Sequence, residues 1–200
     1  SGFTPVGYLN GSAWNGQARV YSVAASYGTA LYIGDPVISS GTSDAFGVQG
    51  IAIGAGTGAL RGVIVGLYDS GSTTAVKGAP TAGLVSNTVY RPASHANVWY
   101  ATVVDDPNVI FQIQEESNGT ALAATDVGLN QITVVTAGNG YSSGWLLRST
   151  TGATPNTTAT LQLRLLGLAQ IPDNVFGAYA KWLVQINVHE LGHGTGAAGV

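Results

Sequence analysis

The residues best suited by type and spacing to do chemistry stand near the end of the sequence, in the run His189-Glu190-Leu191-Gly192-His193. This run matches the H-E-x-x-H pattern of zinc proteases, in which two histidines bind the metal and the glutamate acts as the general base. The arrangement requires a helix, because residues four positions apart share a face only there. The elements around the run therefore decide whether it can hold zinc.

The residues before and after this run favour a strand and a loose tail over a helix. Apolar residues occupy every second position from Trp182 to Val188, which predicts a strand that ends at His189. Glycines follow at 192, 194, 196 and 199, and a glycine costs about 1 kcal/mol relative to alanine in a helix interior. A third protein ligand would also be needed, and His95 or a distant carboxylate would have to supply it. We therefore predict no metal site, and a zinc metalloprotease ranks third among the functions considered.

Other patterns with chemical potential are weaker. Adjacent carboxylates occur at Asp105-Asp106 and at Glu115-Glu116. Neighbouring side chains on a strand point to opposite faces, so neither pair forms an acid–base couple, and we predict turn capping or solvation for both. The glycine-rich stretch 54–62 matches neither the dinucleotide nor the phosphate-loop motif, and the sequence lacks the G-x-S-x-G motif of serine hydrolases. We predict no catalytic residue, no cofactor and no enzymatic activity.

The sequence is poor in charge. Charged residues make up 8% of it, against about 25% in ordinary globular proteins. The net charge is −3 and the seven basic residues are scattered, whereas a nucleic-acid-binding protein needs clustered cations to displace counterions from phosphate. Apolar runs are too short to span a membrane, so we predict neither nucleic acid nor membrane as a partner. The low charge leaves two interpretations: a β-rich protein with a Ser/Thr/Gly surface, or a protein largely covered by neighbours in an assembly.

The strongest structural signal lies in Val98–Gln114, where two runs of β-branched and aromatic residues flank Asp-Asp-Pro-Asn. Such residues favour strands, and Pro107 suits the second position of a type I turn, so we predict a β-hairpin. The first run is apolar on both faces. Such a run is typical of a central strand or of one covered by a partner, and we expect one of its faces in the core and the other against another chain, possibly another copy of this one.

Further short strands separated by turn residues indicate a single all-β domain, a barrel or a sandwich, over residues 17–200 with a glycine-rich C-terminal tail. One or two helical turns are predicted only at 121–129. Residues 1–16 carry apolar side chains among glycines and are predicted as an extended N-terminal arm. This arm either docks on a partner or lies across its own domain. The other main strands are expected at 19–23, 48–53, 62–68, 131–135, 160–169 and 181–189.

Several segments in the second half of the sequence share their residue pattern with a known family. They are YRPAS at 90–94, WYATVVDDP at 99–107, FQIQE at 111–115, RLLGL at 164–168, and the run from PDNVFGAYA at 172–180 to VQINVH at 184–189. They resemble small structural proteins of tailed bacteriophages that are encoded near the major capsid protein and act as head decoration or cement proteins. The resemblance covers roughly residues 90–200. It implies binding outside the head shell, without catalysis and without a cofactor.

We therefore expect a cement protein that is made in the host cytoplasm and binds the outer surface of the capsid in the virion. Its expected partners are the major capsid protein and other copies of itself, with a trimer favoured and a dimer as the next choice. The alternative is a glycan- or surface-binding β module of the virion, an adhesin. A groove lined by exposed aromatic residues such as Trp14, Trp99 or Trp145 would favour that alternative.

Overall fold

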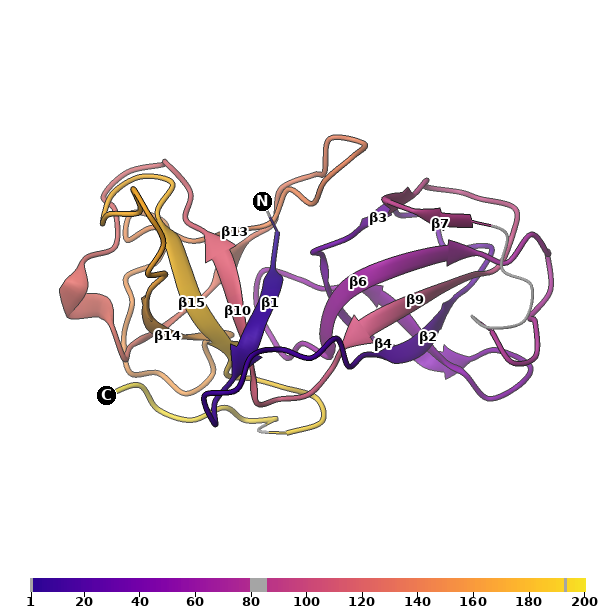
Figure 1. Ribbon diagram of the computed structural model, residues 1–200, viewed down its shortest axis with the longest axis horizontal. Coiled ribbons are helices and arrows are strands. Elements are labelled where there is room, and N and C mark those ends of the chain that lie inside the picture. The colour runs from indigo at the N-terminus through magenta and orange to yellow at the C-terminus, as the bar shows by residue number, and fades with distance from the viewer. Residues whose placement is uncertain (1, 80–85, 193) are drawn as a thin grey trace.

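The computed structural model describes residues 2–79, 86–192 and 194–200, and in these ranges nearly all regular structure is β-strand. The all-β prediction is confirmed. The chain begins in one β-rich lobe, builds a second lobe beside it, and then returns to the first (Figure 1). The elements are β1 (Thr4–Tyr8), β2 (Arg19–Val23), β3 (Leu31–Tyr32), β4 (Pro36–Ser43), β5 (Gln49–Ile53), β6 (Gly62–Asp69), β7 (Ser86–Thr88), β8 (Tyr90–Arg91), β9 (Trp99–Val104), β10 (Val109–Gln114), the 3₁₀ helix η1 (Ala124–Asp126), β11 (Asn130–Gln131), β12 (Thr133–Val134), β13 (Leu146–Leu147), β14 (Leu163–Leu168) and β15 (Lys181–Ile186).

One lobe, here called the barrel lobe, is built on a 6-stranded sheet in the order β4-β5-β2-β9-β6-β7. β4 also pairs with β6, so the strands from β4 to β6 close into a ring and β7 extends β6 beyond it. Apolar side chains fill the ring, among them Tyr21, Val37, Leu67, Trp99 and Val103. Closure removes most of the free strand edges that would otherwise invite pairing with other chains.

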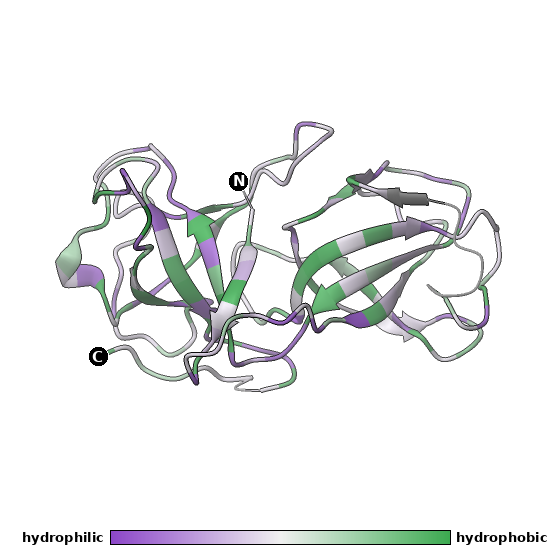
Figure 2. Ribbon diagram, viewed as in Figure 1, coloured by the Kyte–Doolittle hydropathy of each residue, from purple (hydrophilic) through white to green (hydrophobic). Residues whose placement is uncertain are grey.

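The other lobe, the sheet lobe, contains a 5-stranded antiparallel sheet in the order β1-β10-β15-β14-β11. Phe111, Leu165 and Trp182 point from this sheet into a core to which Leu147 of β13 also belongs. The period-two pattern from Trp182 to Val188 is confirmed, because its alternate apolar residues are all buried. Hydrophobic residues follow the strands of both lobes (Figure 2).

The two lobes share buried surface as well as the chain that links them. Leu60, Val63 and Val104 of the barrel lobe belong to the same hydrophobic cluster as the core of the sheet lobe. The Leu60 N–H donates to the Val188 carbonyl at 2.9 Å, and the Glu190 N–H donates to the Leu60 carbonyl at 3.0 Å. The end of the chain beyond β15 therefore closes the seam between the lobes.

The predicted hairpin over Val98–Gln114 is wrong, although both of its strands form. β9 pairs with β2 and β6 in the barrel lobe, whereas β10 pairs with β1 and β15 in the sheet lobe. The turn between them carries the chain from one lobe to the other. β9 is apolar on both faces because it is a central barrel strand whose outer side is covered by its own chain: Trp99 is 2% exposed and Tyr100 is fully buried. The expectation that one face of this strand lies against another chain is therefore also wrong.

The N-terminal segment is built into the sheet lobe. β1 pairs antiparallel with β10 at the edge of the 5-stranded sheet, from Thr4 opposite Gln112 to Tyr8 opposite Val109. Phe3 is 3% exposed and packs edge-on against Phe111, with ring centroids 5.9 Å apart. The sequence left open whether this segment docks on a partner or lies across its own domain. In the structure, β1 lies across its own domain.

Candidate functional site

The H-E-x-x-H run forms part of the seam between the lobes and is not helical. His189 follows the end of β15 and makes a single β-bridge to the barrel lobe. The Glu190 carboxylate accepts hydrogen bonds from the Ser39 N–H at 3.1 Å and the Arg61 Nε–H at 2.7 Å. His193 lies outside the described residues. Within the described ranges, no three His, Cys, Asp or Glu side chains are grouped so that they could hold a metal ion.

The His189 side chain is buried and neutral. Its Nδ1 accepts the Leu191 N–H at 3.0 Å, so the ring proton resides on Nε2, which has no hydrogen-bond partner in the described part of the chain. Burial lowers the pKa of His189 to about 4, and the Arg61 cation acts in the same direction. The carboxylates of Asp105 and Glu190 oppose this shift. Protonation of the imidazole would therefore place a positive charge in the buried seam, where water cannot solvate it.

We expect His189 to make the protein less stable as the pH falls from about 6.5 to about 4. The unfolded chain binds a proton at this histidine near pH 6.5, whereas the folded chain does so only near pH 4, so acid favours the unfolded state in this window. The loss from this group is on the order of 3 kcal/mol. Urea unfolding of the wild type and His189→Gln at about pH 7 and about pH 4.5 measures it. The stability of the wild type relative to the variant should fall at the lower pH, and an unchanged difference would contradict the expectation.

The prediction that Asp105 and Asp106 cap a turn or are solvated holds for one of the two. Asp106 is exposed and its carboxylate accepts the Asn108 N–H at 2.8 Å. Asp105 is 6% exposed, accepts the Tyr21 hydroxyl at 2.5 Å and lies 3.5 Å from the Arg19 Nε. Burial, and then the hydrogen bond to Asp105, raise the pKa of Tyr21 to about 12. Asp105 thus fixes the point where the chain leaves the barrel lobe.

The same prediction is wrong for Glu115 and Glu116, which are both buried. Glu115 accepts the Leu122 N–H at 2.7 Å and the Trp182 Nε1–H at 2.9 Å, and burial raises its pKa. Glu116 accepts the Ser149 N–H at 3.0 Å. The two carboxylates bind different segments, so they anchor loops to the end of β10 and do not form an acid–base couple.

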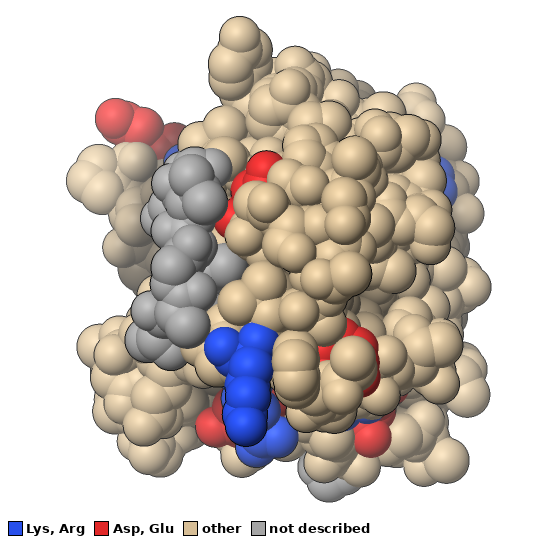
Figure 3. Space-filling view, turned by 90° about the vertical axis from the view of Figure 1, so that its right-hand side faces the viewer, with Lys and Arg blue, Asp and Glu red and all other residues tan. Residues whose placement is uncertain are grey.

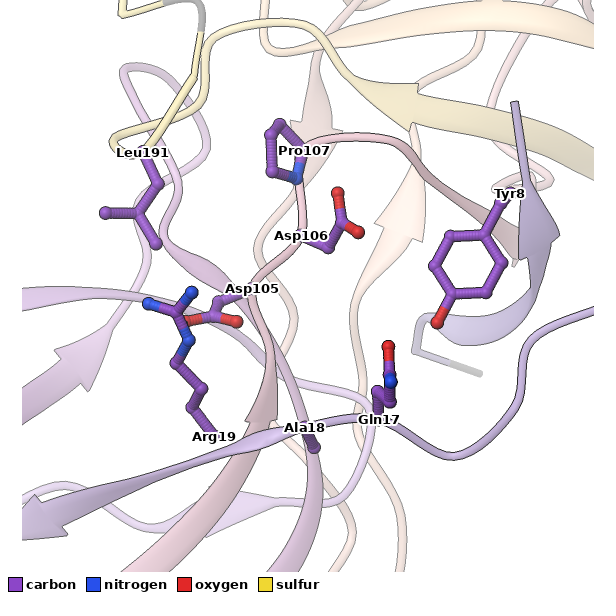
Figure 4. Close-up of a pocket in the computed structure, with 8 residues that line it drawn as sticks. All are labelled: Tyr8, Gln17, Ala18, Arg19, Asp105, Asp106, Pro107 and Leu191. Carbon is purple, nitrogen blue, oxygen red and sulfur yellow. The ribbon is translucent and has the colours of Figure 1, made fainter. Parts of the chain in front are cut away.

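A pocket of about 600 Å³ opens where the lobes meet (Figure 4). Tyr8 and Gln17 point toward one another on one side of it, and Arg19 lies beside Asp105 on the other. The Tyr8 hydroxyl already donates to Asn15 at 2.8 Å, and the Asp105 carboxylate is paired as described above. The groups in the described lining that could act as a nucleophile or a base are Tyr8, Asp105 and Asp106, and each of them already has a hydrogen-bond partner within the protein.

The tryptophans do not line a common, exposed groove. Trp99 and Trp145 are each 2% exposed, and Trp182 is fully buried. Trp14 packs against the core of the sheet lobe, and its Nε1–H donates to the Gln17 carbonyl at 3.3 Å. These four residues therefore do not form the aromatic groove that the glycan-binding alternative requires.

The loop between β14 and β15 exposes large apolar side chains that the packing of the fold does not account for. It lies at the end of the 5-stranded sheet where β10 also ends (Figure 1). Four large apolar side chains are exposed on it, and Val175 is 72% and Tyr179 58% exposed. Large apolar side chains gathered in this way mark interaction sites more often than scattered ones do. The four are Ile171, Val175, Phe176 and Tyr179.

This loop is held in one conformation despite its exposure. The Asn174 amide donates to the carbonyls of Ala169 and Lys181, both at 2.8 Å, and its oxygen accepts the Lys181 N–H at 2.9 Å. Asp173 and Tyr179 have φ values of 61° and 64°, a left-handed conformation that costs about 1–3 kcal/mol for residues other than glycine. Because strained conformations persist where the surroundings hold them, the backbone that carries the apolar side chains is held in place. We call residues 171–179 the docking loop.

Comparisons with protein families, with curated proteins and with solved structures found no match to this chain. Where the structure describes the chain, it contains no helix with the length and apolar character needed to cross a membrane.

Proposed function

We propose that the protein is a structural component of a tailed-phage virion, a decoration or cement protein. It binds the outer surface of the shell of major capsid protein and stabilises that shell. The proposal rests on the sequence resemblance for the identity of the partner. It rests on the docking loop for the manner of binding.

The docking loop supports attachment through burial of apolar surface. Its backbone is already fixed by Asn174 and by the pairing at the ends of β14 and β15, so little backbone entropy is lost when a partner covers the loop. Burying apolar surface contributes roughly 25 cal/mol per Å², and many copies on one shell can bind firmly even when each contact is small. The only charged residues between 169 and 181 are Asp173 and Lys181. A partner surface facing this loop would therefore be apolar and largely uncharged.

The low charge of the rest of the surface supports the same proposal. At the end of the barrel lobe, most of the visible surface belongs to residues other than Lys, Arg, Asp and Glu (Figure 3). Charge depletion is a feature of surfaces that neighbours cover. Contacts of this kind depend little on salt, in contrast to charge-driven association.

We expect Val175→Asp to weaken binding to shells assembled from the major capsid protein of the same genome by at least about tenfold, the effect of about 1.4 kcal/mol. The substitution places a charge where a partner would exclude water, and Val175 is 72% exposed, so the fold should be unaffected. Co-sedimentation of the purified protein with the shells measures the affinity.

Leu9→Asp is the matched control, because Leu9 is 47% exposed just beyond β1 in the sheet lobe and lies outside both the docking loop and the low-charge end of the barrel lobe. It should bind as the wild type does. Equal binding of the wild type and Val175→Asp would remove the docking loop from the contact. Failure of the wild type to bind any shell would overturn the proposed function itself.

A further inference from the structure

A second projecting feature stands apart from the docking loop. Residues 135–145, which join β12 to β13, project from the molecule near its N-terminus (Figure 1). Tyr141 in this loop is 79% exposed, although Trp145 at its base is 2% exposed. The projection therefore offers one large aromatic side chain to the surroundings while its base is anchored in the protein.

The projection is held rigidly. The Asn139 Oδ1 accepts the N–H groups of Tyr141 at 3.1 Å and Ser142 at 2.9 Å, which fixes the tip. In the stem, a Cβ added to Gly144 would lie 2.4 Å from the carbonyl oxygen of Ala137, so the two sides of the loop run in close contact. Because the backbone that carries Tyr141 is already fixed, little backbone entropy is lost when a partner buries the side chain.

A recess of about 290 Å³ lies beside this projection, between its base and the barrel lobe. Tyr32, Ile53 and Trp145 contribute its apolar lining, and the Asp35 carboxylate is the acidic group among the described residues that line it. Asp35 is 2% exposed and accepts the Tyr32 N–H at 2.9 Å and a hydrogen bond from the Ser143 side chain; burial raises its pKa to about 6. A carboxylate offers about four acceptor positions, so Asp35 retains capacity for a further donor.

The surface around the recess is apolar and nearly free of charge. Val135 lines the recess and is 55% exposed. Ile33 and Val89 are 37% and 51% exposed on the adjoining segments that carry β3 and β8, where the Ile33 N–H donates to the Val89 carbonyl at 3.3 Å. The segments that carry them, 31–35, 88–91 and 133–147, contain only two charged residues, Asp35 and Arg91, and both are buried. We call this surface, with its projection and its recess, the hook face.

We infer that the protein pairs with a second copy of itself about a two-fold axis, with each copy inserting its Tyr141 into the recess of the other. A two-fold contact uses the same patch on both copies and must be self-complementary. The hook face meets this condition, because a projecting aromatic side chain and an apolar recess stand next to each other on it. The Asp35 carboxylate accepts the phenol hydroxyl that the second copy brings, and the uncharged rim excludes water around the contact.

This pairing goes beyond attachment to a shell and does not depend on it. The sequence favours a trimer over a dimer, whereas the hook face favours the two-fold arrangement. Because the contact involves only copies of this chain, it can be measured on the purified protein alone. A negative result would leave attachment through the docking loop untouched.

Sedimentation equilibrium of the purified protein over a wide range of concentration tests the inference. The wild type should form a dimer, and Tyr141→Ala should raise the dissociation constant of the dimer by at least about 30-fold, the effect of losing one major contact side chain. Val175→Ala in the docking loop is the control and should leave the dimer intact, since Val175 lies outside the hook face. A monomeric or trimeric wild type would overturn the inference, as would a dimer that survives Tyr141→Ala.

A mixing experiment separates the proposed contact from a general loss of stability. Ala30 lines the recess and is partly exposed, so Ala30→Phe should fill the recess and abolish the dimer in a chain that still carries Tyr141. Mixed with Tyr141→Ala, it should form a heterodimer, because one copy supplies the projection and the other the open recess. Circular dichroism should show both variants folded. If the two variants do not associate when mixed, the insertion of Tyr141 into the recess is wrong.

Discussion

Replacing Tyr100 by glutamate is expected to unfold the barrel lobe. Tyr100 is fully buried in β9; its hydroxyl donates to the Asp44 carboxylate at 2.8 Å and accepts the Val76 N–H at 2.9 Å. A glutamate would place a second carboxylate beside that of Asp44, which forms no ion pair within the described part of the chain. Leaving a buried charge unpaired costs about 3–5 kcal/mol, and the lost ring adds a similar amount, so most of an ordinary stability of about 5–15 kcal/mol would be lost.

Urea unfolding and circular dichroism at neutral pH measure this effect. Trp99→Glu should unfold the lobe as well, because the chain covers both faces of β9. Tyr100→Phe keeps the ring and should remain folded, with a loss of about 1–3 kcal/mol from the unpaired Val76 N–H. A folded Tyr100→Glu variant of near wild-type stability would show that the outer face of β9 is open.

The same strand shows how far the sequence could predict the fold. Residue type and alternation were sufficient to predict where β2, β9, β10 and β15 lie in the sequence. The preference of β-branched and aromatic residues for strands, and the burial of alternate side chains, can be recognised within each strand by itself. Strand partners were not predictable in this way. The turn at 105–108 has hairpin chemistry, including the bond from the Asn108 N–H to Asp106, yet β9 pairs with β2 and β6. Which strands pair is decided by packing between residues that are distant in the sequence. The residue types in a four-residue turn do not predict that packing.

The buried carboxylates and the two exposed loops were missed for a related reason. The hydrogen-bond partners of Glu115 include Trp182, which is distant in the sequence, so its burial had no local signal. Tyr141 and Trp145 are aromatic residues of one loop, but one is exposed and the other is buried. The sequence of the docking loop does indicate exposed apolar side chains, because large apolar residues occur in it among the turn-forming residues Pro, Asn and Gly. Only the structure shows how far they are exposed, from 39% for Ile171 to 72% for Val175.

Deleting residues 1–8 is expected to destabilise the sheet lobe strongly. The deletion removes β1 from the edge of the sheet and takes Phe3 out of the core, where it packs against Phe111. Loss of a buried phenylalanine alone costs about 3–5 kcal/mol. The deletion also breaks the bond from the Phe3 N–H to the Gly34 carbonyl at 2.9 Å, which ties the sheet lobe to the barrel lobe. We expect the truncated protein to be mostly unfolded or aggregated, because these losses together make up a large part of an ordinary stability of about 5–15 kcal/mol.

The point substitution Phe3→Ala separates the core contribution from the strand pairing. It should lower the free energy of unfolding by about 3–5 kcal/mol while β1 can still pair, so the full deletion should cost more than the substitution. Leu9→Ala is the control, because Leu9 is 47% exposed just beyond β1 and should have little effect. The deletion also leaves the apolar strand β10 as a free edge, which favours association with other chains, so aggregation should rise with protein concentration. A truncated protein that stays monomeric with an unchanged melting temperature would mean that the segment is an arm after all, and that the core of the sheet lobe is complete without it.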